Sequence, residues 1–427
     1  MKTYKIHSLW MTLLASLLIG FSSCSDEANV SVSRVCTQTV DDTETVLEKV
    51  RLGEKIRIEG SGFSGLKAVY CNGVIVNGIN PSYVTDNVII FTIPKSIPTG
   101  SSVENPEDLN TIRIVTKDDD FTFPFLILDA APKVTDISNT MARAGEVIEI
   151  YGTDLKDIEK VVFPGGIETT DFTETADRTT LRVAVPEGIG SNSGAITVLG
   201  ANGGAYTYNN FNFISGLFLP DFEGEIYKGG RTSISKNLTE SIPQGIDGPK
   251  SPDVYRAIPA EPGEFPASEK EIGGFNFDIV KAINKVLEAS AGNKDMQPTT
   301  SCSKVAFQCD VYLNVPWQTG TFRLEINGKR ISPLPWLSEG KVIPVDCSGK
   351  GWITVSWPLS SISDYESMTL DALVSSLAGK SASFYFKCGK FQDASGNWFA
   401  GEAMSDAQMF IGNFRLVPYV HNSYNNN

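Results

Sequence analysis

Apolar and polar residues alternate along most of this chain, and glycines interrupt the alternation at regular places. One such stretch, GEKIRIEGSGFSGLKAV, begins at Gly53, and a second, GEVIEIYGTDLKDIEKV, begins at Gly145. The offset of 92 residues persists to FTIP at 91–94 and VAVP at 183–186. Alternation with glycine at the corners is typical of half-buried antiparallel strands joined by turns. We therefore expect two β-sandwich repeats.

The pattern changes after Gly216. FDIVKAINKVLEA places Val280, Ile283 and Leu287 on one helical face and predicts one helix. Strand-like runs follow it, among them VAFQCDVYLNV, TFRLEI, KVIPV, GWITVSW, SASFYFKC and QMFIGNFRLVP. Several such runs separated by turns indicate a larger β-sandwich of jelly-roll type with one or two short helices. The predicted fold class is therefore all-β.

The first residues carry the only long apolar run. Lys2 and Lys5 precede LWMTLLASLLIGF, which at 13 residues has the length of a secretory signal and is too short to span a bilayer, for which roughly 20 residues are needed. The following SSC resembles the lipobox of bacterial lipoproteins, with Phe21 in place of the usual Leu, and makes Cys24 the lipidated residue. An ordinary cleaved signal with an incidental cysteine is the alternative. The next residues, SDE, resemble the export tag of surface lipoproteins in glycan-foraging gut bacteria, so we expect an outer-membrane anchor facing the exterior.

These patterns predict six segments. They are a signal peptide at 1–23, a lipidated tether at 24–34, sandwich repeats at 35–130 and 131–214, a terminal β-sandwich at 215–420 and a disordered tail at 421–427.

The charge balance limits the partners. The formal net charge is −14, and the signal contains two lysines and no acid, so the remainder carries −16. Such a surface repels nucleic acid and anionic lipid. Six cysteines remain besides Cys24, which permits disulfides in an oxidising compartment, but buried free thiols are at least as consistent with their strand-like settings. No zinc-ligand spacing occurs, and we expect no metal and no cofactor.

The motifs of this chain resemble those of two known families. The glycine-bounded repeat resembles IPT/TIG immunoglobulin-like (Ig-like) sandwiches over 31–214. GKGWITVSWPLSSI and FIGNFRLVP, with DVYLNVPW and SPLPW ahead of them, resemble strands of the surface glycan-binding protein B family, although Gly412 stands where the pattern usually has an acid. The resemblance implies a lipidated protein whose terminal domain binds xyloglucan or a related β-glucan and passes it to a SusC/SusD-like importer. The repeats would then be spacers, with ligand binding by them as the alternative.

Tryptophan suits sugar recognition because its flat apolar ring packs beneath the C–H face of a pyranose. Trp352 and Trp357 lie five residues apart on one strand and face opposite sides, with Trp357 on the core face. The predicted glycan-binding residues are Trp317, Trp336, Trp352 and Trp398, with Gln318 and Arg323 as polar partners.

Catalysis has little support in the sequence. The chain beyond the signal has one histidine, His421, so Ser-His-Asp and Cys-His machinery are nearly excluded. A glycoside hydrolase needs only two carboxylates, and an endo-acting hydrolase therefore stays an alternative, as does an adhesion or matrix-binding protein. KDDDF at 117–121 offers oxygen ligands for Ca²⁺ but is read as a solvated turn.

Overall fold

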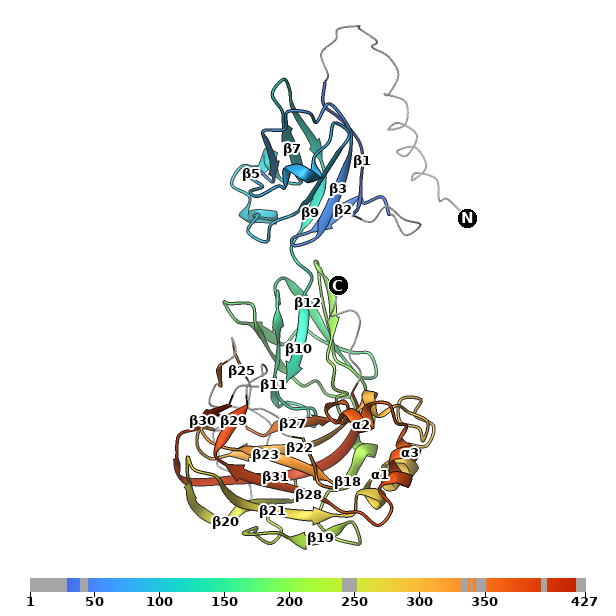
Figure 1. Cartoon of the computed structure of the whole chain (residues 1–427), viewed down its shortest axis with the longest axis vertical. Coiled ribbons are helices and arrows are strands. Elements are labelled where there is room, and N and C mark those ends of the chain that lie inside the picture. Colours follow the sequence, from blue (N-terminus) through green and yellow to red (C-terminus); the bar gives the residue numbers. More distant parts are fainter. Residues whose placement is uncertain are drawn as a thin grey trace, which may run out of the picture. The chain divides into compact units, whose positions relative to one another are not determined.

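The computed structural model (Figure 1) describes residues 29–38, 45–239, 252–331, 337–338, 341–342, 351–392 and 398–419. The chain divides into two units, with the boundary between Ala130 and Ala131. The signal at 1–23, Cys24 and the tail at 421–427 lie outside the described residues, so lipidation and tail disorder stay predictions. Among the described helices, none is both long and apolar enough to cross a bilayer.

The first repeat is a two-sheet sandwich. One sheet has the order β1-β3-β6, formed by Ser31–Thr37, Lys55–Ser61 and Val88–Thr92. The other has the order β5-β4-β7-β8, formed by Val74–Ile75, Ala68–Cys71, Thr111–Val115 and Asp120–Pro124. A parallel pair, β2 (Lys49–Arg51) and β9 (Leu126–Leu128), and the 3-10 turns Pro81–Tyr83, Gly100–Ser102 and Pro106–Asp108 complete it. The alternating residues Ile56, Ile58 and Ile114 are buried between the sheets.

The second repeat has the same plan. Its sheets have the orders β10-β11-β15-β14 and β13-β12-β16-β17. The strands, in chain order from β10 to β17, are Lys133–Ile137, Val147–Thr153, Ile158–Phe163, Ile167–Thr169, Phe172–Glu174, Thr180–Ala184, Thr197–Gly200 and Gly203–Tyr206. Ile148 and Ile150, the counterparts of Ile56 and Ile58, are likewise buried.

Paired glycines explain why the two repeats keep register. A Cβ on Gly60 would lie 1.8 Å from the Ser31 carbonyl oxygen, and one on Gly152 would lie 1.9 Å from that of Lys133. In both repeats the first strand crosses close to this glycine beside a register shift in the ladder. The backbone approach leaves no room for a side chain, so the glycine recurs 92 residues later.

The C-terminal domain is a larger sandwich. One sheet has the order β18-β31-β22-β27, with β20 also paired to β31; its strands are Leu217–Leu219, Met404–Pro418, Val305–Leu313, Ile353–Pro358 and Tyr255–Phe265. The other has the order β19-β21-β28-β23-β24; its strands are Tyr227–Gly230, Lys270–Phe277, Ala382–Cys388, Thr321–Ile326 and Lys329–Ile331. Two hairpins are attached, β25 (Leu337–Ser338) with β26 (Lys341–Val342), and β29 (Lys390–Gln392) with β30 (Trp398–Ala400). The predicted all-β class, with two Ig-like sandwiches and a jelly-roll-type sandwich, is confirmed.

Three α-helices occur in the described residues, α1 (Ile279–Ala289), α2 (Ser363–Glu366) and α3 (Leu370–Ser376), with 3-10 turns at Ile214–Gly216, Cys302–Lys304 and Leu359–Ser361. The predicted helix is α1, which begins where the Asp278 side chain accepts a hydrogen bond from the Lys281 amide. Its fully buried face is formed by Ile279, Ala282, Ile283 and Val286, so the predicted face is wrong by part of a turn: Val280 and Leu287 lie at its edges.

The described cysteines Cys36, Cys71, Cys302, Cys309 and Cys388 are all buried free thiols. Burial raises the pKa of Cys71 and of Cys388 to about 12, because a thiolate would lose its hydration there. The turn reading of KDDDF is confirmed, since Asp119 accepts hydrogen bonds from the Val30 and Asp120 amides between β7 and β8.

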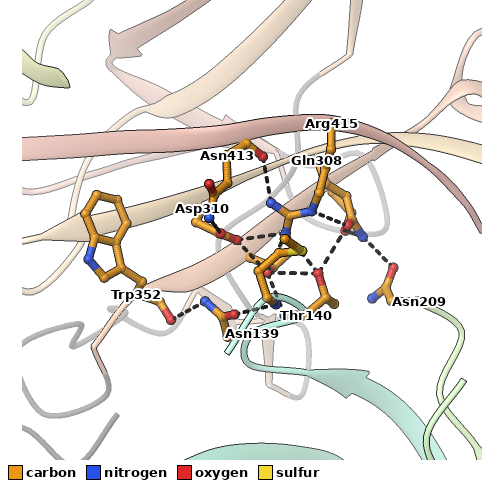
Figure 2. Close-up of polar contacts among 11 residues, drawn as sticks. Asn139, Thr140, Asn209, Gln308, Asp310, Trp352, Asn413 and Arg415 are labelled. Atoms are coloured by element: carbon orange, nitrogen blue, oxygen red, sulfur yellow. Dashed lines mark hydrogen bonds and ion pairs between the residues drawn. The ribbon is translucent and has the colours of Figure 1, made fainter. Parts of the chain in front are cut away.

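A buried ion pair lies on the outer face of the β22-β27-β31 sheet (Figure 2). Arg415 donates from Nη2 to Asp310 Oδ1 at 2.8 Å, and both side chains are 0% exposed. Asn413 donates to the second carboxylate oxygen at 2.8 Å, and Arg415 Nε donates to Gln308 at 3.1 Å. Asp310 lies opposite Gly412 in the ladder.

The second repeat completes this network. Thr140 accepts a hydrogen bond from Arg415 Nη2 at 2.9 Å, and its amide donates to Thr354 Oγ1 at 2.9 Å. Asn139 donates to the Trp352 carbonyl at 2.9 Å, and Thr354 N donates to the Ser138 carbonyl at 2.8 Å. The sandwich supplies the counter-charge of the buried Arg415, and the repeat adds a further acceptor and covers the pair. The second repeat and the C-terminal domain form one unit.

We expect Arg415→Ala to lower the free energy of unfolding of residues 131–427 by about 3–5 kcal/mol, because it leaves Asp310 charged and unpaired in the interior. Guanidinium denaturation of the full chain measures this. Arg143→Ala is the matched control: its ion pair with Asp253 at 2.6 Å joins the same two domains, but the side chains are 53% and 83% exposed. Its loss should cost no more than about 1 kcal/mol. Equal effects would contradict a structural role for the buried pair.

Candidate functional site

Trp317 lies in the core. It is 2% exposed, its Nε1 donates to the Gly320 carbonyl at 3.0 Å, and its ring packs against Phe386. Its predicted role as an open stacking platform is therefore wrong. The signal was present in the sequence, because Leu313, Val315 and Trp317 continue the alternation of β22 past its end. Trp357 lies in the core, as predicted, and is 0% exposed. Its indole N–H donates to the Phe322 carbonyl.

Trp352 faces the other side of the sheet from Trp357, as predicted, yet it is only 1% exposed. Its ring packs against Tyr255 and Tyr312, and the second repeat bonds its carbonyl through Asn139. Figure 2 shows its ring pointing away from the Arg415 network. The predicted stacking role is wrong here as well, because the outer face of this sheet is covered by other parts of the chain.

All four connections that cross between the two sheets at one end of the domain can be located from the strand registers. In one sheet, Phe265, Leu313 and Ile353 lie at the same end as the start of β31. In the other, Lys270, Thr321, Ile331 and Cys388 share one end. The connections 266–269, 314–320, 332–352 and 389–403 therefore emerge together, and we call this the loop end. Figure 1 shows β25, β29 and β30 on this side of the domain.

The buried Thr319 joins three of these connections. Its hydroxyl donates to the Pro266 carbonyl at 3.2 Å and accepts from the Gly389 amide at 3.3 Å. Next to it, the Gln318 carbonyl accepts from the Glu402 amide at 2.8 Å. The Gln318 side chain is half-buried, and its amide bonds to no other described residue. Thr319 was not predicted, since a single threonine in a turn carries no signal of such contacts.

The remaining predicted aromatics belong to the connections of the loop end. Trp336 lies outside the described residues, between β24 and β25. Trp398 begins β30, where the structure describes its backbone, paired with Gln392. Neither prediction is tested by the structure. Both tryptophans belong in sequence to connections whose described ends lie at the loop end, which also carries Gln318.

Arg323 lies on the outer face of β23, half-buried, opposite Tyr385 of β28. Its Nε donates to Thr321 Oγ1 at 3.0 Å. Arg323 lies three residues after the connection 314–320 ends. Next to it, polar side chains of neighbouring strands contact one another across the sheet. The structure thus places Arg323 beside the end where Gln318 lies, on a different surface.

These polar side chains are Glu325, Arg330, Tyr385 and Arg231, and they bond one another and shift each other's pKa values. The hydrogen bond from Arg330, at 2.8 Å, is the main cause that lowers the pKa of Glu325. Tyr385 donates to the same carboxylate at 3.0 Å, and burial, with this bond, raises the pKa of its phenol. Arg231 stacks over the Tyr385 ring, 4.6 Å from its centre. These groups form a network of mutual contacts on a face that stays partly exposed, with Arg330 58% exposed.

A hollow of about 570 Å³ lies between the second repeat and the C-terminal domain. Its polar lining includes Arg143, Glu187, Asp221 and Asp253, and its one aromatic, Phe211, is buried. It presents no open ring on which a sugar could stack. No group of three potential metal ligands occurs in the described part of the chain.

Comparisons with known proteins identify the C-terminal domain. The family described as "Surface glycan-binding protein B xyloglucan binding domain" matches residues 218–418, nearly the whole of this sandwich. Residues 218–418 therefore form a domain of the surface glycan-binding protein B family. A search of curated proteins finds no match.

Solved structures show the same architecture. Surface glycan-binding protein PbSGBP-B from Prevotella bryantii is 17% identical, with a TM-score of 0.57, and the match covers 94% of this chain and 100% of that one. The SGBP-B of a complex xyloglucan utilization locus in Bacteroides uniformis is 16% identical over 92% and 99% of the chains, with a TM-score of 0.42. The shared fold rests on the first of these.

We expect Trp317→Ala to lower the free energy of unfolding by about 3–5 kcal/mol, because it opens a cavity beside Phe386. Gln318→Ala, at the neighbouring half-exposed position, should change it by about 0.5 kcal/mol or less. Chemical denaturation of the two variants measures the difference. A Trp317→Ala protein with wild-type stability and lost ligand binding would restore the platform role.

Proposed function

We propose that this chain is a non-catalytic, lipid-anchored protein of the outer cell surface that captures a β-glucan, with xyloglucan the first candidate, for a SusC/SusD-like uptake system. The observation that carries the proposal is the match of residues 218–418 to a xyloglucan-binding-domain family. The captured polysaccharide binds at the loop end of that domain.

The loop end is supported by exclusion and by composition. Both inner sheet faces form the core, and the second repeat covers part of one outer face. The connections of the loop end contain Trp336 and Trp398. Each stacked indole contributes about 1–2 kcal/mol by burying apolar ring surface. Gln318, whose side-chain amide has no partner among the described residues, reads a sugar hydroxyl.

The absence of catalysis is supported by the state of the carboxyl groups. A glycosidase needs an acid whose pKa is raised so that it holds a proton near neutral pH. Hydrogen bonds from Arg330, Lys387 and Lys281 lower the pKa values of Glu325, Glu269 and Glu225 in this domain. The pKa values of Asp364 and Asp371 are lowered too, by hydrogen bonds from Lys329 and Thr369 respectively. Surface carboxylates with lowered pKa values, four of them ion-paired and Asp371 hydrogen-bonded to a hydroxyl, fit a binding domain.

The anchor and the uptake partner rest on the N-terminal sequence and on family resemblance. A lipid on Cys24 holds many copies on one surface, and the SDE that follows it routes them outward. Binding through a few rings is weak, at about micromolar to millimolar Kd. Several tethered copies that engage one long polysaccharide then increase retention through effective concentration.

Affinity electrophoresis in gels that contain xyloglucan, mixed-linkage β-glucan, mannan or host glycans tests the proposal. We expect the wild-type protein to be retarded in a β-glucan gel. Trp336→Ala and Trp398→Ala should each weaken binding about fivefold to thirtyfold, which corresponds to the loss of one stacked ring. Gln318→Ala should weaken it less.

Ile214→Ala is the matched control for this experiment. Ile214 is an exposed apolar residue of the same unit, but it lies on the interdomain hollow and not at the loop end. Its removal should leave retardation unchanged. Wild-type mobility in every gel would refute glycan capture, and full retardation of both tryptophan variants would refute the site.

Prolonged incubation with the retained polysaccharide should release no new reducing ends above a protein-free blank. A general acid must hold a proton near neutral pH, and the carboxyl groups named above have lowered pKa values instead. Release of new ends that disappears on substitution of one Asp or Glu would show a hydrolase instead.

A further inference from the structure

A rigid turn in the first Ig-like repeat displays an aromatic ring. Val76, Ile79 and Val84 pack on the core of that repeat and hold residues 76–84 in place. The side chain of Asn80 accepts from the Ser82 amide and caps the 3-10 turn Pro81–Tyr83. Tyr83 is 50% exposed, and it lines a hollow together with Val76 and Ile79. Half of its side chain is therefore accessible at a turn whose neighbours are anchored in the core.

Beside Tyr83 lies a hollow of about 230 Å³ along the edge strand β6. β6 is the last strand of its sheet, and alternate residues of an antiparallel edge strand direct their backbone groups away from the partner. Ile93 exchanges hydrogen bonds with Gly53 and Glu54, so the outward residues are Ile90 and Thr92, both in the lining. Residues whose backbone N–H and C=O groups point away from β3 thus line the same hollow as Tyr83.

The side chains of the lining suit a neutral polyol. They include the amides of Asn77 and Asn80, the Thr92 hydroxyl and the Lys55 ammonium, with no carboxylate, although the chain carries a net charge of −14. Asn77 and Lys55 have no hydrogen-bond partner among the described residues. Hydroxyl-reading groups around one flat open ring are the requirements for binding a pyranose.

We propose that the hollow beside Tyr83 is a second glycan-binding site, which holds one hexopyranose ring of the same polysaccharide that the C-terminal domain captures. The inference rests on the proposed function. The volume is below that of sites for drug-sized ligands, about 300–1,000 Å³, which favours a single ring over an oligosaccharide. A protein partner would need an interface of about 1,000 Å² or more, and the hollow occupies one edge strand and one turn.

Such a site acts through chain length. One ring alone binds too weakly to matter, but a polymer already held by the C-terminal domain presents further rings at high effective concentration. Retention of a long polysaccharide therefore depends on Tyr83, whereas binding of a short oligosaccharide does not.

Full-chain wild type and Tyr83→Ala, Tyr83→Phe and Leu126→Ala variants test this in gels containing the polysaccharide and by calorimetry with its heptasaccharide. We expect Tyr83→Ala to weaken retention on the polymer about threefold to tenfold, with the heptasaccharide Kd and the melting temperature unchanged. Tyr83→Phe keeps the ring and should match wild type. Leu126, 40% exposed in the same repeat and outside the hollow, is the control, and its removal should have no effect.

The outcomes separate the two proposals. Retardation of the wild type with equal retardation of Tyr83→Ala overturns the second site and leaves glycan capture intact. An equal loss with the heptasaccharide also overturns it, because the effect would not depend on length. Failure of the wild type to bind any polysaccharide overturns both.

Discussion

The face of the C-terminal sandwich on which the second repeat packs carries a guanidinium and a carboxylate that have both been removed from water. Arg415 has five N–H donors, and a buried arginine is tolerated only when its charge and donors are matched. Asp310, Gln308 and the Asn413 carbonyl supply part of that environment from the sandwich itself. Thr140 supplies a further acceptor from the repeat. The sheet face is therefore complete only in the presence of its neighbour.

This coupling decides which surfaces of the C-terminal domain remain open. A single hydrophobic core fills the space between the inner faces of the two sheets. One of its rings, Phe384, contacts the rings of Phe275, Phe277, Phe414 and Trp357. One outer face carries the second repeat, and the other carries ion pairs around Tyr385, in which Arg330 is 58% exposed. The proposed recognition site is formed by the connections of the loop end. Rigid strands position them, and Thr319 links three of them.

Tryptophan serves two purposes in this domain, and local sequence distinguishes them poorly. Trp317 and Trp357 bury the ring and satisfy the indole N–H with a backbone carbonyl. Trp352 looks outward-facing from its polar neighbours Thr354 and Ser356, but those neighbours belong to a polar interdomain face. Polar residues beside an aromatic thus indicated an interface between domains and not an interface with water. The buried rings account for stability, and the proposed binding role passes to Trp336 and Trp398.

The sequence by itself determined the strands, the repeat and the fold class, because these follow from local periodicity and from glycines that a close backbone approach requires. It also carried the family resemblance and the helix at 279–289, whose capping residue Asp278 acts within one turn. Only the tertiary structure decided that Trp317 and Trp352 are covered, that Asp310 pairs with Arg415 105 residues away, and that four separate connections meet at one end. Burial and ion pairing between distant segments depend on which faces pack together, and a pattern with a period of two residues specifies only that a face is covered, not by what.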